Sequence, residues 1–306
     1  MSHLLFSNPA QMRGPATSKQ IASLDPEQDY EEIARFLYAY EFSWDIERAL
    51  EFALFRTYGI PAISGLLAKT GEFETRPRKR YDDTELILAE TIENGLDSRR
   101  GKRAIARMNA MHNRFRIDNS DMLYVLSTFI CEPIRWLDRY GRRPMTPREQ
   151  RAWFLYYRGL GERMGIKGIP MELETIMYWN EAYEVTNFRF AETNRRISEA
   201  TIRLLLGFYL PRWLFWAGRP AVRALLDPAL LDAMGLRPVP RWFSRVTVAA
   251  LRMRAGILRL LPPRRKPRLL TQRPRPTYPE GYRIEDLGTF RVMEAASQKS
   301  CAHDPH

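Results

Sequence analysis

Apolar residues recur every three to four positions along most of the chain, which is the spacing of one face of an α-helix. In residues 25–42 an acidic first turn is followed by Ile33, Phe36, Leu37 and Tyr40 on one face, as is typical of a helix N-terminus. Up to residue 95 no stretch alternates apolar and polar residues as a half-buried strand does. The pattern therefore predicts an all-α fold.

Glycine, proline and capping residues divide this pattern into separate helices. Thr146 and Glu149 form a capping box with Pro147 at the first helical position, which predicts a helix that begins there and ends before Gly165. Between residues 75 and 85 the chain is polar and charged, and we expect a loop. Helices are expected over residues 25–42, 45–58, 61–70, 84–94, 100–117, 119–140, 147–164 and 172–206.

Prolines shape the rest of the prediction. Pro133 should kink its helix at about residues 129–132, because proline lacks a backbone donor and collides with the preceding turn. From Pro262 onward the chain is rich in proline and arginine, and we expect it to be extended over the surface or disordered. Five further prolines should divide the region after residue 206 into short helices: Pro211, Pro220, Pro228, Pro238 and Pro240.

The composition is that of a globular protein, with 306 residues of which 45% are hydrophobic. We expect an N-terminal arm over residues 1–24, one helical domain over 25–261 and a tail over 262–306. Cys131 and Cys301 provide neither a disulfide framework nor zinc spacing, which favours a reducing compartment. Because no signal peptide or long apolar run is found, we expect a cytoplasmic protein, with a peripheral position on the inner face of the membrane as an alternative.

Positive charge is concentrated in the C-terminal third. Residues 201–276 carry 16 Arg or Lys against two Asp, a net charge of +14, whereas residues 1–200 hold 29 of each sign. Trp and Leu alternate with these arginines from Tyr209 to Leu226, and we find no nucleic-acid-binding module. The pattern favours contact with an anionic membrane surface; the alternative is that these helices pack on the domain and expose their arginines to water.

One histidine, His112, lies among apolar residues in a predicted helix. Helical spacing places Met108 and Arg116 on its face, with Ile105 and Phe115 beside them. A single histidine in such a stripe is more often a hydrogen-bonded core residue than a ligand. The residue pattern alone therefore leaves both interpretations open, a core histidine and a metal ligand.

The sequence around this histidine, RMNAMHNRFRI at residues 107–117, and the residues that follow it as far as Ile166 resemble the rubber oxygenase (latex-clearing protein) and MpaB-type oxygenase family. Residues 51–73 and 80–86 and the pair Tyr183-Glu184 are similar to the family as well. The resemblance implies a globin-like helical bundle that encloses a b-type haem. It also implies an enzyme that uses dioxygen on unsaturated apolar substrates.

The resemblance implies that His112 is the proximal ligand of the haem iron. Arg107, Arg114 and Arg116 are candidates to bind the haem propionates, because a guanidinium keeps its charge and its planar fork matches a carboxylate. The alternative for each arginine is a solvated surface position.

On the distal side, Glu51, Lys69 and Thr70 align with a glutamate and a Lys-Thr pair of the family. The chain departs from the rubber-cleaving pattern at Leu66, where that pattern has an arginine. In an apolar pocket Glu51 would have a raised pKa and act as the base for an allylic proton. Glu47 is an equal candidate, and the alternative for both is a surface carboxylate.

We therefore expect a haem b oxygenase of the dioxygenase type, acting on a small unsaturated prenyl or lipid-like substrate, with oxidative cleavage of a C=C bond as the candidate reaction. Two alternatives come from other classes of protein. One is a haem-binding sensor or carrier without turnover. The other is a membrane-surface interaction protein without a cofactor.

Overall fold

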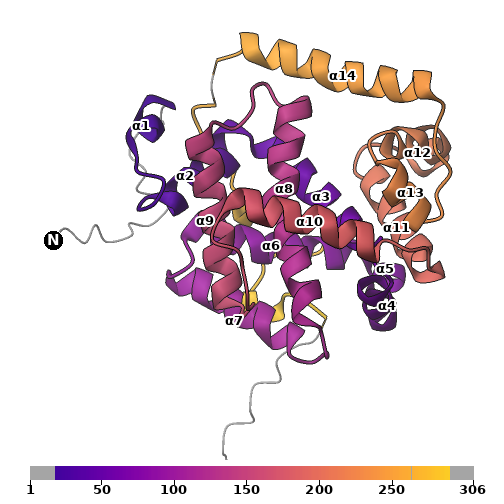
Figure 1. The fold of residues 1–306 in the computed structure, drawn as a ribbon, viewed down its shortest axis with the longest axis horizontal. Coiled ribbons are helices and arrows are strands. Elements are labelled where there is room, and N and C mark those ends of the chain that lie inside the picture. Colours follow the sequence, from indigo (N-terminus) through magenta and orange to yellow (C-terminus); the bar gives the residue numbers. More distant parts are fainter. Residues whose placement is uncertain (1–17, 263, 290–306) are drawn as a thin grey trace, which may run out of the picture.

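The computed structural model describes residues 18–262 and 264–289, and every regular element among them is helical. The predicted all-α fold is thus confirmed (Figure 1). The elements are α1 (Ser18–Ser23), α2 (Tyr30–Phe36), η2 (Leu37–Glu41), α3 (Ser43–Thr57), α4 (Pro61–Thr70), α5 (Glu72–Thr75), α6 (Pro77–Asn94), α7 (Arg99–His112), α8 (Asn119–Tyr140), α9 (Pro147–Arg163), α10 (Leu173–Asn187), α11 (Glu192–Leu206), η3 (Arg212–Leu214), α12 (Phe215–Arg223), α13 (Pro228–Ala233), α14 (Arg241–Leu260), η4 (Leu270–Gln272) and η5 (Ile284–Asp286).

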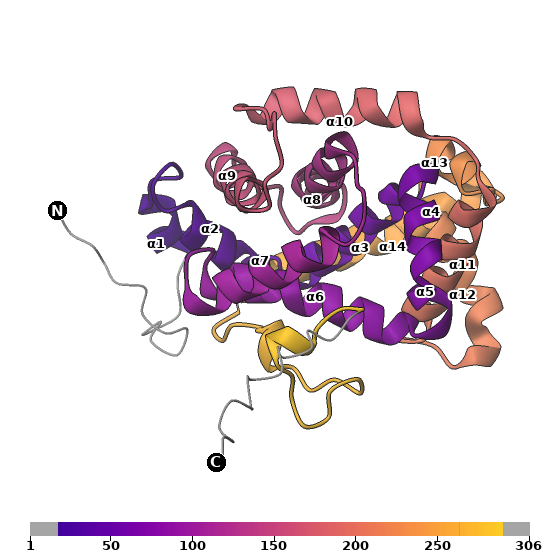
Figure 2. The ribbon, with the colours of Figure 1, turned by 90° about the horizontal axis from the view of Figure 1, so that it is seen from below.

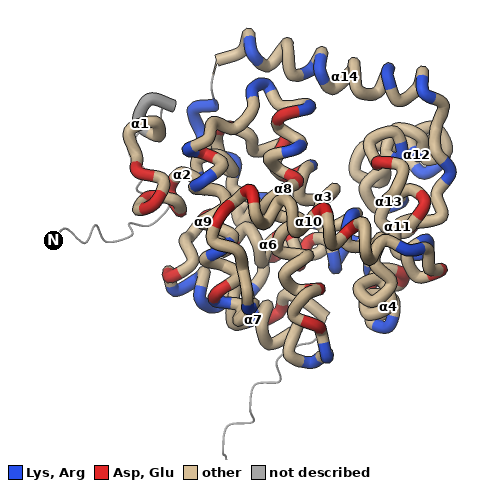
Figure 3. Tube along the Cα trace, viewed as in Figure 1, with Lys and Arg blue, Asp and Glu red and all other residues tan. Residues whose placement is uncertain are grey.

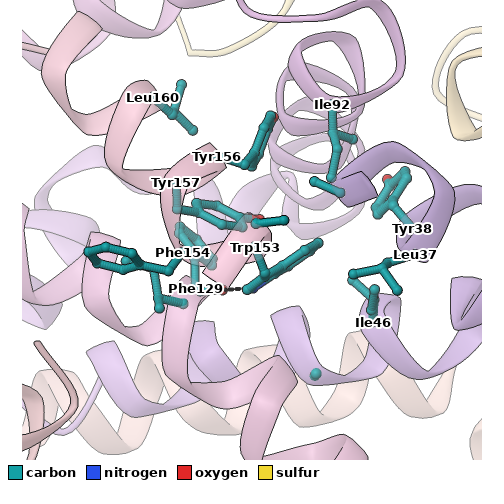
Figure 4. Packing of buried hydrophobic residues seen from close by; sticks show 14 of the residues in the cluster. Leu37, Tyr38, Ile46, Ile92, Phe129, Trp153, Phe154, Tyr156, Tyr157 and Leu160 are labelled. Atoms are coloured by element: carbon teal, nitrogen blue, oxygen red, sulfur yellow. Dashed lines mark hydrogen bonds between the residues drawn. The ribbon is translucent and has the colours of Figure 1, made fainter. Parts of the chain in front are cut away.

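Three pairs of helices build the main core: α3 packs along α8, α2 along α9 and α6 along α7 (Figures 1 and 2). The side chains of Trp153, Tyr156 and Tyr157 on α9 lie at its centre and face Leu37 and Ile46 (Figure 4). A second, smaller core joins the end of α3 to α11 and α13. The two cores meet along α3, which therefore connects both halves of the molecule.

Pro133 lies inside α8, and a side chain supplies the hydrogen bond that it removes. Because proline has no N–H, the carbonyl of Phe129, four residues earlier, loses its helical donor. The buried indole Nε1 of Trp153 donates to that oxygen at 3.2 Å (Figure 4). The helix continues on both sides of the proline, from Asn119 to Tyr140.

The charged loop expected over residues 75–85 is a wrong prediction. α6 begins at Pro77, whose fixed φ suits the first helical position. Lys79 Nζ lies 2.7 Å from Asp83 Oδ2, four residues further along the same helix face. The charges thus pair with one another within the helix, so this stretch is a helix and not a loop.

The basic region is more regular than predicted. Pro220 lies within α12, and after Pro240 the chain forms α14, an uninterrupted helix of 20 residues. The expectation of short helices is wrong for this part of the chain, because no proline occurs between residues 241 and 260. In Figure 1 α14 spans one edge of the molecule.

Residues 264–289, which we call the C-terminal strap, pack on α6 and α7 instead of lying loosely on the surface (Figure 2). Leu270, Ile284 and Leu287 are buried. The backbone N–H of Leu270 donates to Glu93 on α6 at 2.6 Å. The composition of the strap alone would permit disorder. Its apolar side chains are buried and its backbone satisfies a buried carboxylate of α6, which explains why it follows an ordered path.

We predict that Trp153→Phe lowers the free energy of unfolding by about 1–3 kcal/mol, because it leaves the buried Phe129 carbonyl without a donor. The matched control is the same change in a Pro133→Ala background, in which the backbone N–H of residue 133 can bond to that carbonyl. Urea denaturation of the four proteins should give a smaller loss in the alanine background. Equal losses in both backgrounds would contradict this account.

Candidate functional site

His112 is the last residue of α7. The helix begins at Arg99, and the side chain of the N-cap residue Ser98 accepts the backbone N–H of Gly101 at 2.9 Å. It ends at His112, five residues earlier than the predicted end at residue 117, and a turn follows. The prediction that Arg116 shares a helical face with the histidine is therefore wrong.

The imidazole of His112 is held in a neutral state. Its Nδ1 atom is buried and has no hydrogen-bond partner among the described residues. Burial lowers the pKa of His112 to about 4, and the positive charge of Arg80 acts in the same direction. A neutral imidazole with a free lone pair is the form that ligates iron, and an unsatisfied buried nitrogen is uncommon in a core. The side chain therefore fits a metal ligand better than a satisfied core histidine.

Arg80 on α6 connects this histidine to an aromatic wall. Its guanidinium lies 5.6 Å from the ring centroid of Phe73, and Phe73 packs edge-on against Tyr58 at 5.7 Å. Sequence analysis missed Arg80 because it placed the residue in a loop. The signal that could have found it is Pro77 followed by charges four residues apart, which together indicate a helix.

The three arginines predicted to bind propionates have different positions. Arg107 is buried, and its Nε donates to the carbonyl of Leu287 in the C-terminal strap at 2.6 Å. Arg114 and Arg116 are exposed in the turn after α7. Arg107 thus helps to hold the strap on α7, whereas a propionate contact of Arg114 or Arg116 stays a prediction.

The last turn of α7 is fixed by the strap at a second point. Gly288 has a φ of +93°, and a Cβ built at this glycine would lie 1.9 Å from the sulfur of Met111. Only a residue without a side chain can approach so closely in this left-handed conformation. The contact lies beside His112, so the strap contributes to the position of the candidate ligand.

Glu51 lies in a buried group of charged side chains on α3 and α6. Its Oε1 accepts the hydroxyl of Tyr81 at 2.6 Å and lies 2.8 Å from Arg48 Nη2. Burial raises the pKa of Glu51 to about 8, and Arg48 opposes that rise. The expected rise of the pKa agrees with the structure, but the surroundings are polar and not simply apolar.

Glu47, the equal candidate, has a different environment. It too is buried, and three arginines reach it: Arg48 at 2.6 Å, Arg268 at 2.7 Å and Arg273 at 3.7 Å. These ion pairs make Glu47 a structural anchor that connects α3 to the C-terminal strap. Glu51, with one arginine partner and a pKa of about 8, is the better candidate to hold and release a proton.

Lys69 and Thr70 lie at the end of α4. The side chain of Lys69 is exposed, and the hydroxyl of Thr70 donates to the carbonyl of Leu67 in its own helix at 2.7 Å. Among the described residues, no hydrogen bond or ion pair joins either side chain to His112 or Glu51. Their distal role stays a prediction, and it requires a movement of Lys69 from the position seen here.

An open groove of about 1110 Å³ lies between α5, α6, α11 and α12. It combines aromatic and cationic side chains, among them Phe73, Arg78, Phe208, Arg212, Trp216 and Arg219. Two of its walls border the site: Phe73 packs on Tyr58, and Phe208 packs edge-on against Tyr81 at 5.0 Å. Tyr81 in turn binds Glu51. Phe208 and Tyr81 thus separate the groove from Glu51, and Phe73 separates it from Arg80 beside His112.

The geometry defines a class: a helical protein with a half-buried, neutral histidine whose Nδ1 is buried, a buried proton-holding glutamate and an aromatic groove nearby. The family model of the "ER-bound oxygenase mpaB/B'/Rubber oxygenase, catalytic domain" matches residues 57–257. The chain belongs to this family, as the resemblance implied.

Two curated relatives agree with this assignment. The ER-bound oxygenase mpaB' of Penicillium brevicompactum is 32% identical over 246 residues, which are 74% of this chain and 57% of that protein. The ER-bound oxygenase mpaB of Penicillium roqueforti (strain FM164) is 30% identical over 237 residues, 71% of this chain and 78% of its own length. The chain thus spans little more than half the length of the first of these relatives.

Among the described residues, no helix combines the length and the apolar character needed to cross a bilayer.

We predict that Glu51→Gln becomes more stable relative to the wild type as the pH rises. Between pH 4.5 and about 8 folded Glu51 keeps a proton that the unfolded chain has lost, so the wild-type free energy of unfolding falls through this window. Glutamine does not titrate, so the difference between the two proteins should grow by roughly 2–4 kcal/mol from pH 5 to pH 8. Chemical denaturation at several pH values measures it. Glu174→Gln, at an exposed position on α10, is the matched control and should show no such trend.

Proposed function

We propose that the protein is a haem-dependent oxygenase that acts with dioxygen on an unsaturated apolar substrate of prenyl or lipid type. The observation that carries this proposal is the neutral imidazole of His112, whose buried Nδ1 has no partner among the described residues. Membership in an oxygenase family supports the reaction class.

The residues present fit a b-type haem. When bound, the haem would supply an iron that takes up and activates dioxygen. His112 would hold the iron through one ring nitrogen, and the C-terminal strap keeps the end of α7 in place for that bond. Arg80, which acts on His112, and Arg114 and Arg116, which follow α7, are candidates to bind the propionates, because arginine stays charged in any such site.

Glu51 would be the base that accepts the allylic proton of the substrate. With a pKa of about 8, its carboxyl group is mostly protonated at pH 7, and it can accept an allylic proton only after it has lost its own. The Tyr81 hydroxyl donates to Glu51 Oε1 and so orients the carboxyl group. The rate should therefore increase with pH up to about 8 if Glu51 is the base.

The groove suits the approach of an elongated apolar substrate. Phe73, Phe208 and Trp216 offer aromatic faces, and the side chains of Phe73 and Phe208 form the layer between groove and site. A chain with double bonds would lie along these rings, and rotation of the two phenylalanines would open the way inward. We propose this groove as the substrate entrance.

The exposed position of Lys69 supports a second candidate function, a haem-binding sensor or carrier. In that case His112 would still hold the haem, whereas Glu51 would act only as part of the buried charge network. Substrate turnover distinguishes the two candidates, because a carrier consumes no oxygen.

We predict that the purified protein contains one non-covalently bound b-type haem per chain, and that His112→Gly loses most of it. Pyridine haemochrome analysis measures the stoichiometry, and added imidazole should restore haem binding to the glycine variant. Lys102→Ala, at an exposed position of the same helix, is the control and should keep its haem. A folded wild-type protein that stays free of haem under haem-sufficient expression would rule out the proposal.

We predict that Glu51→Gln keeps its haem and visible spectrum while turnover of a prenyl-type alkene falls by about 10²-fold or more. Lys69→Ala should keep its haem but change the resting spectrum if Lys69 moves to the iron. Oxygen uptake coupled to carbonyl products is the assay, with His112→Gly as the blank. If both variants match the wild type in spectrum and turnover, the distal assignment is wrong; if the wild type binds haem but consumes no oxygen, the carrier function is favoured.

A further inference from the structure

α14 is attached to the rest of the protein by one face only. The guanidinium of Arg254 lies 3.7 Å from the ring centroid of Trp44 and 3.0 Å from Asp45 Oδ1, both on α3. Ala255 is buried, and Arg259 Nε donates to the carbonyl of Arg142 at 2.5 Å. These contacts hold the helix along the edge of the molecule and determine which face points outward.

The outward face of α14 is apolar. Trp242, Val246, Met253, Ile257 and Leu260 are spaced by four, seven, four and three residues, which places them on one stripe of a helix. Their exposed fractions are 65%, 58%, 67%, 53% and 86%. Single exposed apolar side chains are ordinary, but five along one helix form a continuous patch that marks an interaction surface.

A row of arginines borders this stripe. Arg241, Arg245, Arg252 and Arg259 are spaced by four, seven and seven residues and so follow one side of the apolar residues. α14 contains no Asp or Glu, as Figure 3 also shows. Three exposed cations continue the row beyond the helix, at residues 264–266. The whole exposed face is therefore apolar and cationic.

We propose that α14 is a membrane-docking helix that lies in the headgroup region of an anionic bilayer, with its apolar stripe in the acyl boundary and its arginine row at the lipid headgroups. Trp and Arg are the side chains that favour this depth. The proposal is independent of the haem and of the reaction, because none of these residues contacts the candidate site.

Charge complementarity favours an anionic bilayer over a second copy of the chain. Two α14 helices facing each other would bring two arginine rows together without an acidic residue on either helix. A bilayer presents a broad negative surface over an apolar interior, which matches the stripe and the row at the same time. Arg254 and Arg259 hold α14 in place, so the face is already formed without a membrane and little order has to be gained on binding.

The sequence pattern predicted membrane contact for the basic region of residues 201–276, in which Arg, Trp and Leu are interleaved from Tyr209 to Leu226. α14 lies inside this region, and the structure adds which of its faces points outward. Tyr209, Trp213 and Trp216 are exposed as well, although Arg48 donates to the hydroxyl of Tyr209 and Trp216 lines the groove.

Flotation of the full-length protein with lipid vesicles tests the proposal. The wild type should float with vesicles that contain 30% phosphatidylserine, float far less with pure phosphatidylcholine, and dissociate in high salt. Exchange of Arg241, Arg245 and Arg252 for Gln should weaken binding to anionic vesicles by about 100-fold, roughly fivefold for each charge. Exchange of the same three residues for Lys should preserve it.

The apolar stripe is tested with Val246→Ser, Met253→Ser and Ile257→Ser combined, which should weaken binding more than tenfold. The matched control combines Tyr178→Ser with Val185→Ser, whose side chains are exposed on α10, and it should bind like the wild type. All five side chains are exposed, so thermal melts should show folded proteins. Wild-type protein that does not float, or stripe variants that float like the wild type, would overturn the proposal. If the wild type does not float and the stripe substitutions convert a dimer into a monomer, the stripe binds a second copy of the chain and the proposal is overturned.

Discussion

Buried carboxylates on α6 impose the constraint on which much of the structure depends. Asp82, Asp83, Glu90 and Glu93 are almost completely buried, and a buried charge without partners is very costly. The C-terminal strap supplies most of the partners: Arg275 reaches Asp82 at 2.8 Å, the hydroxyls of Tyr278 and Tyr282 bind Asp83 and Glu90, and Thr271 binds Glu93. α6 can therefore be buried only when the strap covers it, and the two segments, almost 200 residues apart, depend on each other.

The candidate site depends on the same arrangement. α6 carries Arg80 and Tyr81 toward His112 and Glu51, and the strap holds the end of α7 through Arg107. Burial then gives the two functional groups opposite properties: it lowers the pKa of the histidine and raises that of the glutamate. At neutral pH both are uncharged, which suits one to bind a metal and the other to hold a proton.

The main core and the second core have different roles. The core around α8 and α9 supplies rigidity, as in the bond from Trp153 to the carbonyl exposed by Pro133. The second core, α12 and α14 provide the groove and the basic outer surface, where aromatic rings and arginines occur together. If α14 docks on a membrane and the groove is the substrate entrance, an apolar substrate dissolved in that membrane would reach the side of α12 and α14 first.

Local signals in the sequence determined the helical fold and the capping box at Thr146, because helical periodicity and capping act within a few residues. The choice of His112 came from the family resemblance, since the residue pattern alone left both a core histidine and a ligand open. The start of α6 at Pro77 was missed although its signals are local, a proline at the first position and charges four residues apart. Local signals did not determine the path of the strap. That path depends on partners far away in the chain: the carboxylates of α6 need Arg275, and Arg107 needs the carbonyl of Leu287. Tertiary structure also distinguished Glu51 from Glu47, since only the folded chain pairs Glu47 with two arginines of the strap and places Glu51 against Tyr81. Burial and long-range charge pairing are properties of the folded chain, so no local pattern records them.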